Sequence, residues 1–329
     1  MQQVLLGLSG GVDSAVAALL LREQGYDITG CYLDNGLPGA EAARRAASEL
    51  NIPLVEADIR EDLERLVCAP FAEYYSRGET PSPCIFCNRS VKFPRLLQEA
   101  DRLGIEKIAT GHYARCREGR IYKAVSSNDQ SYMLCRLLPE QAGRLLLPLG
   151  GWEKPLVRER AGEARLAAAR KPDSMEICFI PDGDYAAWME RRGVCPKAGN
   201  LIYEGKPVGR HEGIHHYTVG QRRHLGVALG KPVYVAEIRP DTGDVILADA
   251  DDVYCDRLRF SDLSRLVPEG LWPREFTARV RHSRSDTPAG FFENENTVRF
   301  SAPVRAATPG QAVAFYDGDL LLGGAFIRR

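Results

Sequence analysis

Short apolar runs alternate with segments of helical periodicity along the first third of the chain. The runs predict strands at residues 4–8, 27–33, 53–57 and 107–110. The segments between them predict helices at residues 15–21, 40–50, 61–76 and 90–103. Apolar strands separated by helices are typical of βαβ units, so we expect an α/β domain with a doubly wound parallel sheet. Ligands bind such sheets at the carboxyl ends of the strands.

The pattern changes in the rest of the chain. Residues 137–149 and 158–170 are predicted to be helix or loop, and residues 172–181 an exposed loop. Further on, Gly, Pro and Asp separate short apolar runs at residues 233–236, 245–247, 276–280 and 312–316. This spacing predicts small β-rich domains. We therefore expect three domains, at residues 1–195, 196–253 and 254–329.

Length and composition agree with a multidomain globular protein. The chain has 329 residues, and a single core stops growing at roughly 250–300. Its apolar runs all fall short of the ~20 residues that span a bilayer. Met1 leads directly into the first apolar run, without a basic segment and a cleavage site. We expect a cytosolic protein that does not contact membranes.

The net charge of −1 neither favours nor excludes an RNA ligand. Phosphate contacts are made by locally clustered Lys and Arg, so a local basic face is sufficient. Each candidate cluster is equally well explained as solvated surface charge. The clusters are Arg158/Arg160/Arg165, Arg222/Arg223/His224 and Arg279/Arg281/Arg284.

A glycine-containing segment, SGGVDS at residues 9–14, lies between the first predicted strand and helix. Gly10 and Gly11 let the backbone turn sharply and approach a ligand closely. The N–H groups at the start of the following helix form an anion site, and Ser9 and Ser14 add hydroxyl donors. The segment therefore predicts a phosphate-binding loop.

Asp13 is unexpected beside a phosphate unless a metal ion or the local amides compensate its charge. Alternatively it caps the helix. The segment lacks the Lys of the G-x-x-x-x-G-K-[ST] motif, which disfavours a kinase-type loop. It resembles the pyrophosphate loop of enzymes that split ATP into AMP and pyrophosphate. That resemblance implies adenylation of a carbonyl oxygen.

Nine cysteines, an odd number, do not indicate a disulfide framework in a reducing compartment. Six are isolated and are expected to be small buried hydrophobes: Cys31, Cys68, Cys116, Cys135, Cys195 and Cys255. Cys84 and Cys87 differ, because they form a Cys-x-x-Cys in a proline-rich turn.

Five motif segments extend this pattern along the chain. They are TPSPCIFCNRSVKF at residues 80–93, ATGHYAR at 109–115, DQSY at 129–132, DSMEICFI at 173–180 and YTVGQRR at 217–223. In this order they closely resemble the bacterial and mitochondrial tRNA-specific 2-thiouridylases, which modify the wobble uridine. The resemblance runs from Val4 to TPGQ at 308–311 and LGG at 322–324.

The resemblance implies a pyrophosphate-loop ATPase domain, a small central tRNA-binding domain and a C-terminal β-barrel. It also implies that the chain uses ATP and Mg²⁺, with a tRNA and a sulfur donor, either sulfide or a sulfur-relay or desulfurase protein, as partners. The nucleotide-binding residues would be Ser9, Gly10, Gly11, Asp13, Ser14, Leu33, Gly111 and His112. The residues near the tRNA would be Gln130, Gln221, Arg222 and Arg223.

By the same resemblance, Cys178 receives sulfur as a persulfide and Cys87 forms a disulfide with it as the sulfur is released. The chemistry is coherent, because adenylation of the C2 oxygen of uridine converts it into part of an AMP leaving group. A persulfide or bound sulfide then attacks C2, in two easier steps instead of one. A polar, partly exposed loop is expected to favour the reactive thiolates. The base must leave its stack to reach them.

Cys84 departs from the family pattern, which has Asp at this position. It is a bystander, or it belongs to a structural zinc site with Cys87, Cys178 and, as a fourth ligand, Cys195. In the third alternative, Cys84, Cys87 and Cys178 hold a [4Fe–4S] cluster with one open iron, which carries hydrosulfide to the base. Cys87 and Cys178 are then ligands instead of redox partners.

Smaller departures are the short loop at residues 34–39, Asn128 in place of Lys, and Met175-Glu176 in place of Thr-Gly. Two other classes of function remain open. One is an adenylating enzyme that acts on a small molecule or on a different tRNA base. The other is a non-catalytic tRNA-binding or iron–sulfur carrier protein, which has no need of an intact pyrophosphate loop.

Overall fold

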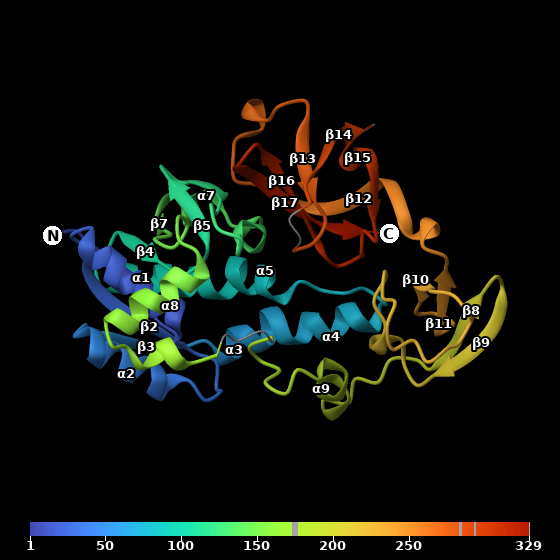
Figure 1. Cartoon of the computed structure of the whole chain (residues 1–329), viewed down its shortest axis with the longest axis horizontal. Coiled ribbons are helices and arrows are strands. Elements are labelled where there is room, and N and C mark those ends of the chain that lie inside the picture. The colour runs from blue at the N-terminus through green and yellow to red at the C-terminus, as the bar shows by residue number, and fades with distance from the viewer. Residues whose placement is uncertain (173–176, 283–284, 293, 329) are drawn as a thin grey trace.

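The computed structural model describes residues 1–172, 177–282, 285–292 and 294–328. Its first part contains a five-stranded parallel sheet with strand order β3-β2-β1-β4-β7 (Figure 1). The strands are β1 (Gln3–Gly7), β2 (Asp27–Asp34), β3 (Leu54–Asp58), β4 (Lys107–Ala109) and β7 (Leu145–Leu146). The predicted strands are thus confirmed, and the edge strand β7 was not foreseen.

Helices cover both faces of this sheet, as predicted. Val4 and Leu6 of β1 pack in one apolar cluster with residues of three helices, whereas Leu5 packs in a second cluster on the other face. The helices of the first face are α1 (Val12–Glu23), α2 (Ala40–Leu50) and α8 (Lys154–Glu163). The opposite face is covered by α6 (Phe93–Arg102). The fold is a doubly wound α/β sheet.

Two long helices in this part are each interrupted by a π-helical turn. In the first, α3 (Arg60–Leu63) continues through a π turn at Glu64–Cys68 into α4 (Ala69–Ser76). In the second, α5 (Pro83–Cys87) continues through a π turn at Asn88–Lys92 into α6. π turns are rare and occur frequently at functional sites. Here one ends at Cys68 and the other begins directly after Cys87.

The second half contains two separate β-structures. A four-stranded sheet has the order β10-β11-β8-β9, from β8 (Gly199–Tyr203), β9 (Lys206–His211), β10 (Tyr234–Arg239) and β11 (Asp244–Ala248). A six-stranded barrel has the order β12-β15-β14-β13-β16-β17 and is closed by pairing of β12 with β17. Its strands are β12 (Tyr254–Arg265), β13 (Phe276–Arg279), β14 (Thr287–Phe292), β15 (Asn294–Arg305), β16 (Ala312–Asp317) and β17 (Leu320–Arg328). The predicted β-rich half is confirmed, and the domain limits at 195 and 253 stay predictions.

The barrel packs directly on the first part of the chain (Figure 1). The hairpin of β5 (Ala114–Arg117) and β6 (Arg120–Lys123) extends the barrel sheet, with Tyr122 paired to Leu320. Tyr132 donates a hydrogen bond to the carbonyl of Ala312 at 2.8 Å. Phe86 stacks on Phe326 with ring centroids 4.5 Å apart. The barrel and the sheet domain therefore share one apolar core.

Two loop predictions need revision. Residues 137–149 form a short helix, α7 (Pro139–Gly143), followed by β7, and α8 with a 3₁₀ turn at Ala167–Arg170 confirms the helical alternative for 158–170. The prediction of an exposed loop at 172–181 was wrong for Phe179 and Ile180, which are 8% and 1% exposed. Phe179 packs edge-to-face on Phe71 at 5.5 Å, because the segment contributes to an aromatic cluster with α4 and α9 (Tyr185–Arg191).

Within the described residues, every helix is too short or too polar to cross a bilayer.

Candidate functional site

The SGGVDS segment forms a compact loop between β1 and α1. The Ser14 hydroxyl donates to the carbonyl of Gly11 at 3.0 Å and accepts the N–H of Ser9 at 3.2 Å. The Ser9 hydroxyl lies 3.3 Å from that of Ser14. Gly11 precedes α1 and makes no side-chain cap. The loop thus holds its shape through its own serines and presents the amino end of α1.

Backbone packing around the loop requires residues without side chains. Gly10 has φ of +71°, and a Cβ there would lie 2.5 Å from the carbonyl carbon of Ala42. A Cβ on Gly111 would lie 2.9 Å from the carbonyl carbon of Asp13. Gly111, predicted beside the nucleotide, therefore contacts the loop backbone directly. Leu33, near the carboxyl end of β2, is half-buried. It packs against the apolar cluster of the sheet that contains Leu5 and against the cluster that contains residues of α4.

Asp13 lies in the first turn of α1 and does not cap it. Lys154, at the start of α8, places Nζ 2.8 Å from both carboxylate oxygens of Asp13. The Tyr113 hydroxyl donates to Asp13 Oδ1 at 2.7 Å. A cation from a distant helix therefore balances the acid that looked out of place beside a phosphate. Sequence reasoning missed both partners, because only the fold brings them to the loop.

Lys92 connects this loop region with the cysteines. His112 stacks on Phe93, and its Nδ1 lies 2.8 Å from the Thr110 hydroxyl. Burial and the nearby charge of Lys92 lower the pKa of His112 to about 3, so the imidazole is neutral at pH 7. The same Lys92 charge acts on Cys87 and Cys178. One predicted nucleotide residue, His112, and two predicted sulfur residues, Cys87 and Cys178, thus lie within electrostatic range of one lysine, to which the sequence assigned no role.

The structure brings Cys84, Cys87 and Cys178 together, although they come from separate segments. Cys84 and Cys87 lie on α5, and Cys178 lies on the segment before α9. Cys84 and Cys178 are exposed, and Cys87 is half-buried. The three thiols are near enough for the negative charge of one thiolate to disfavour ionisation of a neighbour. A charge on Cys84 opposes ionisation of Cys87, and charges on Cys84 and Cys87 oppose ionisation of Cys178.

Burial and neighbouring thiolates hold the Cys87 and Cys178 thiols in their protonated form. Desolvation and the neighbouring Cys87 raise the pKa of Cys178 to about 11, and Lys92 only partly opposes this. Burial likewise raises the pKa of Cys87, against the effect of Lys92. The expectation that a polar loop favours the thiolates was therefore wrong. Their proton must be removed by another group or by coordination to a metal.

The three cysteines fit a single zinc ion poorly as they lie. Sulfurs on one tetrahedral zinc, with Zn–S ~2.3 Å, are roughly 3.8 Å apart. Among the described residues, no three cysteine sulfurs all lie within 4.8 Å of one another. Thiolates on separate irons of a cubane cluster stand farther apart than those on one ion, and thiolates are the usual cluster ligands. Three thiolates are nevertheless a donor set that an iron–sulfur cluster can use.

A fourth cysteine lies beside this group. Cys68, at the end of the first π turn, is 4% exposed and packs in the same apolar cluster as Cys87 and Phe179. Burial first, with smaller effects from Cys178 and Cys87, raises its pKa to about 12. The sequence placed Cys68 among isolated buried cysteines, and its burial is confirmed, but it is not isolated. Cys195, named as a possible fourth zinc ligand, is exposed and belongs to no such group in the described part of the chain.

The predicted tRNA-contacting glutamines use their side chains inside the protein. Gln130 Oε1 accepts the N–H of Tyr113 at 3.0 Å, next to the phosphate loop. Gln221 Oε1 accepts the N–H of Thr218 at 2.9 Å, and its Nε2 donates to the carbonyl of Arg223 at 3.0 Å. Gln130 supports the loop region, and Gln221 shapes its own turn.

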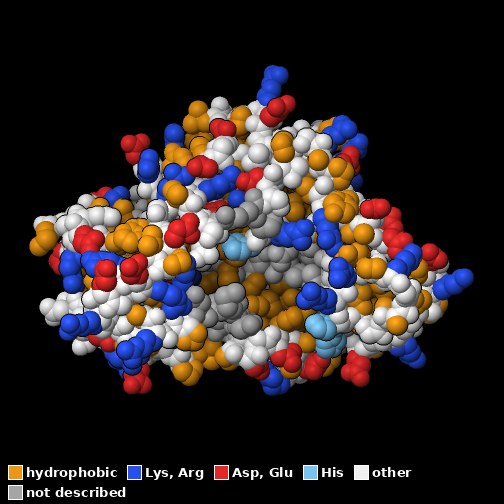
Figure 2. Space-filling model, viewed as in Figure 1, with side chains coloured by type: hydrophobic (Ala, Val, Ile, Leu, Met, Phe, Trp, Pro, Cys, Tyr) orange, Lys and Arg blue, Asp and Glu red, His pale blue; other side chains and the backbone are white. Residues whose placement is uncertain are grey.

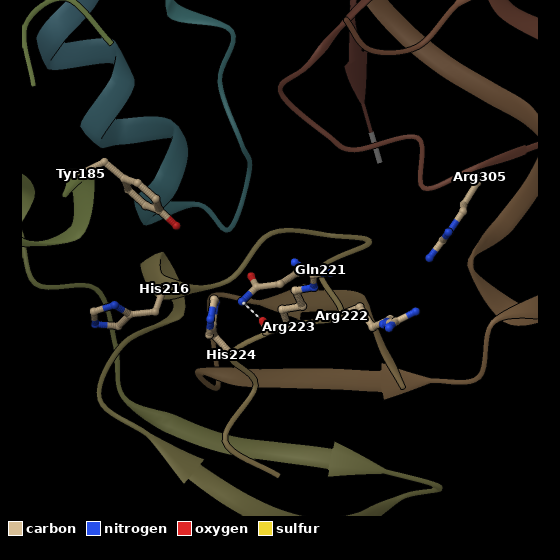
Figure 3. A pocket seen from close by; sticks show the side chains of 7 residues that line it. All are labelled: Tyr185, His216, Gln221, Arg222, Arg223, His224 and Arg305. Carbon is tan, nitrogen blue, oxygen red and sulfur yellow. Dashed lines mark hydrogen bonds between the residues drawn. The ribbon is translucent and has the colours of Figure 1, made fainter. Parts of the chain in front are cut away.

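A basic pocket of about 760 Å³ lies between the central sheet and the barrel. Arg222 and Arg223 line it as predicted, and both are exposed. Figure 3 shows Arg305 of the barrel facing them from the opposite wall, with Tyr185 and His216 at the other end. In Figure 2 this face is hollowed at its centre, and Lys and Arg side chains gather along one side of the hollow. The full lining is Tyr185, His216, Gln221, Arg222, Arg223, His224 and Arg305.

A second pocket of about 350 Å³ adjoins the first through Gln221 and includes Arg281. It approaches the cysteine segment, because the Thr80 hydroxyl donates to that of Thr218 at 3.2 Å. Gln311, also in this pocket, donates to the carbonyls of Thr80 and Pro81 at 3.1 Å each. The two pockets therefore adjoin, and residues of the second are hydrogen-bonded to the segment that carries Cys84.

In the other two basic clusters, several arginines contact groups of the protein itself. Arg158 donates to the carbonyls of Ala169 and Lys171, and Arg160 pairs with Glu23 and Glu163, so both hold the protein itself together. Arg279 is not a surface residue but is 4% exposed and ion-paired with Asp129 and Asp286. Arg284 and the residues 173–176 of the DSMEICFI motif lie outside the described residues. The Arg222/Arg223/His224 cluster is therefore the best-placed basic face.

Family models match the chain in three consecutive ranges. Residues 2–182 match a tRNA methyl transferase HUP domain, residues 192–249 a tRNA methyl transferase PRC-barrel domain, and residues 256–327 an aminomethyltransferase beta-barrel domain. A solved structure, the U34-tRNA thiolase NcsA from Methanococcus maripaludis with its [4Fe-4S] cluster, is 18% identical over 58% of this chain and 66% of that chain. Its TM-score of 0.37 is too low to support an inference about this chain.

Curated relatives match over the full length. The tRNA-specific 2-thiouridylase MnmA of Carboxydothermus hydrogenoformans is 42% identical over 100% of this chain and 98% of its own length. The protein of the same name from Lachnoclostridium phytofermentans is 40% identical over 99% of both chains. Because relatives this similar span the whole chain, it belongs to the tRNA-specific 2-thiouridylase family.

Proposed function

We propose that the chain uses ATP to adenylate the C2 oxygen of the wobble uridine in tRNA and then replaces that oxygen with sulfur. The observation that carries this proposal is the position of Lys92, which acts electrostatically on His112 beside the phosphate loop and on Cys87 and Cys178. An activation site and a sulfur site so close together suit a two-step reaction on one atom. Membership of the family, whose named relatives are tRNA-specific 2-thiouridylases, supports the same conclusion.

In the activation step, the loop formed by Ser9 to Ser14 would bind the ATP phosphates through its N–H groups at the start of α1. Mg²⁺ would accompany the phosphates. Lys154 already balances the Asp13 carboxylate, so the loop accepts an anion without a metal bound to Asp13. Lys154 would also hold the Asp13 carboxylate in place, so that its charge does not repel the phosphates. Stabilising charge that develops in the transition state is the largest catalytic contribution available here.

In the transfer step, two routes differ in what the cysteines do. In the persulfide route, the terminal sulfur on Cys178 attacks C2 and AMP leaves with the former C2 oxygen. The Cys87 thiolate then attacks Cys178 Sγ, which breaks the sulfur–sulfur bond, frees the thiouridine and forms a Cys87–Cys178 disulfide. A thiol reductant must reduce this disulfide before the next turnover.

In the second route, Cys84, Cys87 and Cys178 would hold a [4Fe–4S] cluster. A bound cluster of this kind supplies an iron site for hydrosulfide. Coordination to such a cluster would remove the protons that Cys87 and Cys178, with their raised pKa values, retain as free thiols. The presence of a third cysteine, Cys84, in the same group supports this route.

The tRNA would bind along the two adjoining pockets, starting at Arg222 and Arg223. These side chains are exposed and face Arg305, which suits contacts with backbone phosphates. The adjoining pocket leads past Gln221 toward Thr80, and so toward the cysteines. The extruded base would follow this path to the sulfur site.

The deciding experiment measures iron and acid-labile sulfide on protein purified without oxygen, together with thiolation of added tRNA. About four irons per chain, lost in Cys84→Ala along with thiolation, support the cluster route. Absence of iron, with a Cys87–Cys178 disulfide after one turnover, supports the persulfide route. AMP release without tRNA, on a small-molecule substrate, or tRNA binding without AMP release would each refute the proposed function.

A further inference from the structure

A cluster of potential metal ligands lies outside the sulfur and nucleotide sites. Glu190 belongs to α9, whereas His215 and His216 belong to a 3₁₀ turn at Ile214–His216 before the central sheet's last two strands. Glu190 Oε1 lies 3.0 Å from His215 Nε2 and 3.5 Å from His216 Nε2. All three ligand atoms lie within 4.8 Å of one another, the only such group in the described part of the chain.

One of these distances matches an edge of a metal coordination sphere. Zinc binds imidazole nitrogen and carboxylate oxygen at ~2.0–2.2 Å in a tetrahedron, which places neighbouring ligand atoms roughly 3.3–3.6 Å apart. The 3.5 Å separation falls in that range, whereas the 3.0 Å separation is the hydrogen bond between His215 and Glu190 that a bound ion would replace. One carboxylate oxygen thus faces two imidazole nitrogens as it would across a shared ion.

His215 is held rigidly in this position. Its side chain is 3% exposed, and its ring lies against Gly213, where a Cβ would come within 2.3 Å of Cε1. The ring centroids of His215 and His216 are 4.1 Å apart. Its buried Nδ1 has no hydrogen-bond partner among the described residues. Its Nε2 lies within hydrogen-bond distance of Glu190, so only Nδ1 of this buried ring is left unsatisfied, which is unusual because buried polar groups are normally paired.

The charge around the cluster also suits a cation. Besides Glu190, the carboxylates of Glu212 and Asp184 act on His216. Arginines line the pocket beyond His216, but in Figure 3 they lie at the other end of it. The cluster is therefore an acidic rim beside a basic pocket.

We propose that Glu190, His215 and His216 bind one divalent transition-metal ion, for which Zn²⁺ is the best match. Two imidazoles and a carboxylate are a common donor set for this ion, and they leave a fourth position for water or a phosphate oxygen. Bound there, the ion joins α9, which follows the Cys178 segment, to the turn that precedes Gln221 and Arg222. The proposal stands apart from the thiolation reaction and does not depend on it.

The test must separate this site from the cysteines, whose thiolates are also potential zinc ligands. We would measure Zn²⁺ affinity by competition with a chromophoric chelator in full-length protein carrying Cys84→Ser, Cys87→Ser and Cys178→Ser. The expected result is one zinc per chain. Adding Glu190→Gln or His216→Asn should weaken binding at least ~10-fold. His224→Asn, an exposed histidine of the same pocket, serves as the matched control and should change nothing.

A second measurement uses the unmodified chain, in case the triple variant does not fold. Co²⁺ bound to thiolates gives intense charge-transfer bands, whereas Co²⁺ on nitrogen and oxygen gives only weaker d–d bands. His216→Asn should remove a nitrogen- and oxygen-ligated Co²⁺ and leave the thiolate bands unchanged. Zinc binding that is absent from the triple variant, or equally tight after Glu190→Gln and His216→Asn, would overturn the proposal. So would a Co²⁺ spectrum that His216→Asn does not alter.

Discussion

Lys154 Nζ lies 2.8 Å from both carboxylate oxygens of Asp13, so the start of α8 is tied to the phosphate loop. Tyr113, immediately before β5, donates to the same carboxylate. Three segments distant in sequence therefore meet at the first turn of α1. The contact gives the loop a fixed cation that a search for a loop lysine in the sequence does not find.

Lys154→Ala should lower the rate of AMP formation by about 10²-fold, the effect of removing one preorganised charge from a transition state. Stability should change by less than ~1 kcal/mol, because the pair is partly exposed to solvent. The measurement is tRNA-dependent AMP release beside chemical denaturation. Lys107→Ala, whose ammonium donates to a surface carbonyl, is the control. Unchanged AMP release in Lys154→Ala would remove the lysine from the activation step.

Gly10→Ala should abolish ATP binding, whereas Gly11→Ala should reduce it only modestly. At Gly10 the backbone is left-handed, and a Cβ would collide with the backbone of Ala42. At Gly11 the nearest atom to a Cβ is the Ser9 hydroxyl oxygen at 3.3 Å, which can rotate away. Calorimetric titration with ATP compares the two variants. Equal affinities would show that the loop shape does not decide nucleotide binding.

Alkylation of Cys178 in metal-free protein should be slow at pH 7 and should rise with pH through about 11. Only the thiolate reacts, and desolvation together with Cys87 keeps this thiol protonated. Lys92→Gln removes the charge that favours ionisation, so it should raise the pKa further and slow alkylation at every pH below it. Mass spectrometry after iodoacetamide gives the rates. Fast alkylation at pH 7 that Lys92→Gln leaves unchanged would contradict this description.

Arg222→Ala and Arg223→Ala should each weaken tRNA binding and reduce its salt dependence. A lost phosphate contact lowers the slope of log affinity against log salt by roughly 0.7–0.9. Filter binding at several salt concentrations measures the slope. Arg239→Ala removes the same charge from the central sheet, at a side chain paired with Glu237, and should leave the slope unchanged. A slope that is equal in all three variants would place the tRNA elsewhere.

Arg279→Ala should destabilise the protein by about 3–5 kcal/mol, because it leaves the buried Asp129 without its ion-pair partner. Asp286 adds a pH dependence. Burial alone would raise the pKa of Asp286, but Arg279 and Lys123 hold it below its ordinary value. The stabilisation is therefore present above about pH 4 and is lost as the pH falls below that value. Urea denaturation should give a smaller free energy of unfolding below pH 4 than at pH 7. This decrease should be smaller in Arg279→Ala than in the unmodified chain.

The local pattern was sufficient to predict most of the elements. The residues at Val4–Leu6 are all apolar, because both faces of this strand are buried. In residues 40–50 the apolar positions recur with helical periodicity, because one face of this helix is buried. The phosphate loop was recognisable because its glycines and serines act within six consecutive residues. Strand β7 has only two residues, too few to show a period, and it was missed.

The site could be predicted only where its residues act locally. Lys154 and Lys92 gain their roles from positions across the fold, and Cys68 lies near the other cysteines because its π turn packs against α5. Arg279 looked like a surface cation, and its burial depends on acids at positions 129 and 286. The sequence holds no local signal for such pairings.

The last strand of the barrel carries a consequence for protein synthesis. Strand β17 closes the barrel, pairs with Tyr122 and places Phe326 on Phe86, one residue before Cys87. A chain still emerging from the ribosome therefore cannot complete the surroundings of its sulfur site until residues 320–328 have been translated. A product truncated before this strand carries the whole phosphate loop and every cysteine of the site, yet it lacks the support that holds α5 in place.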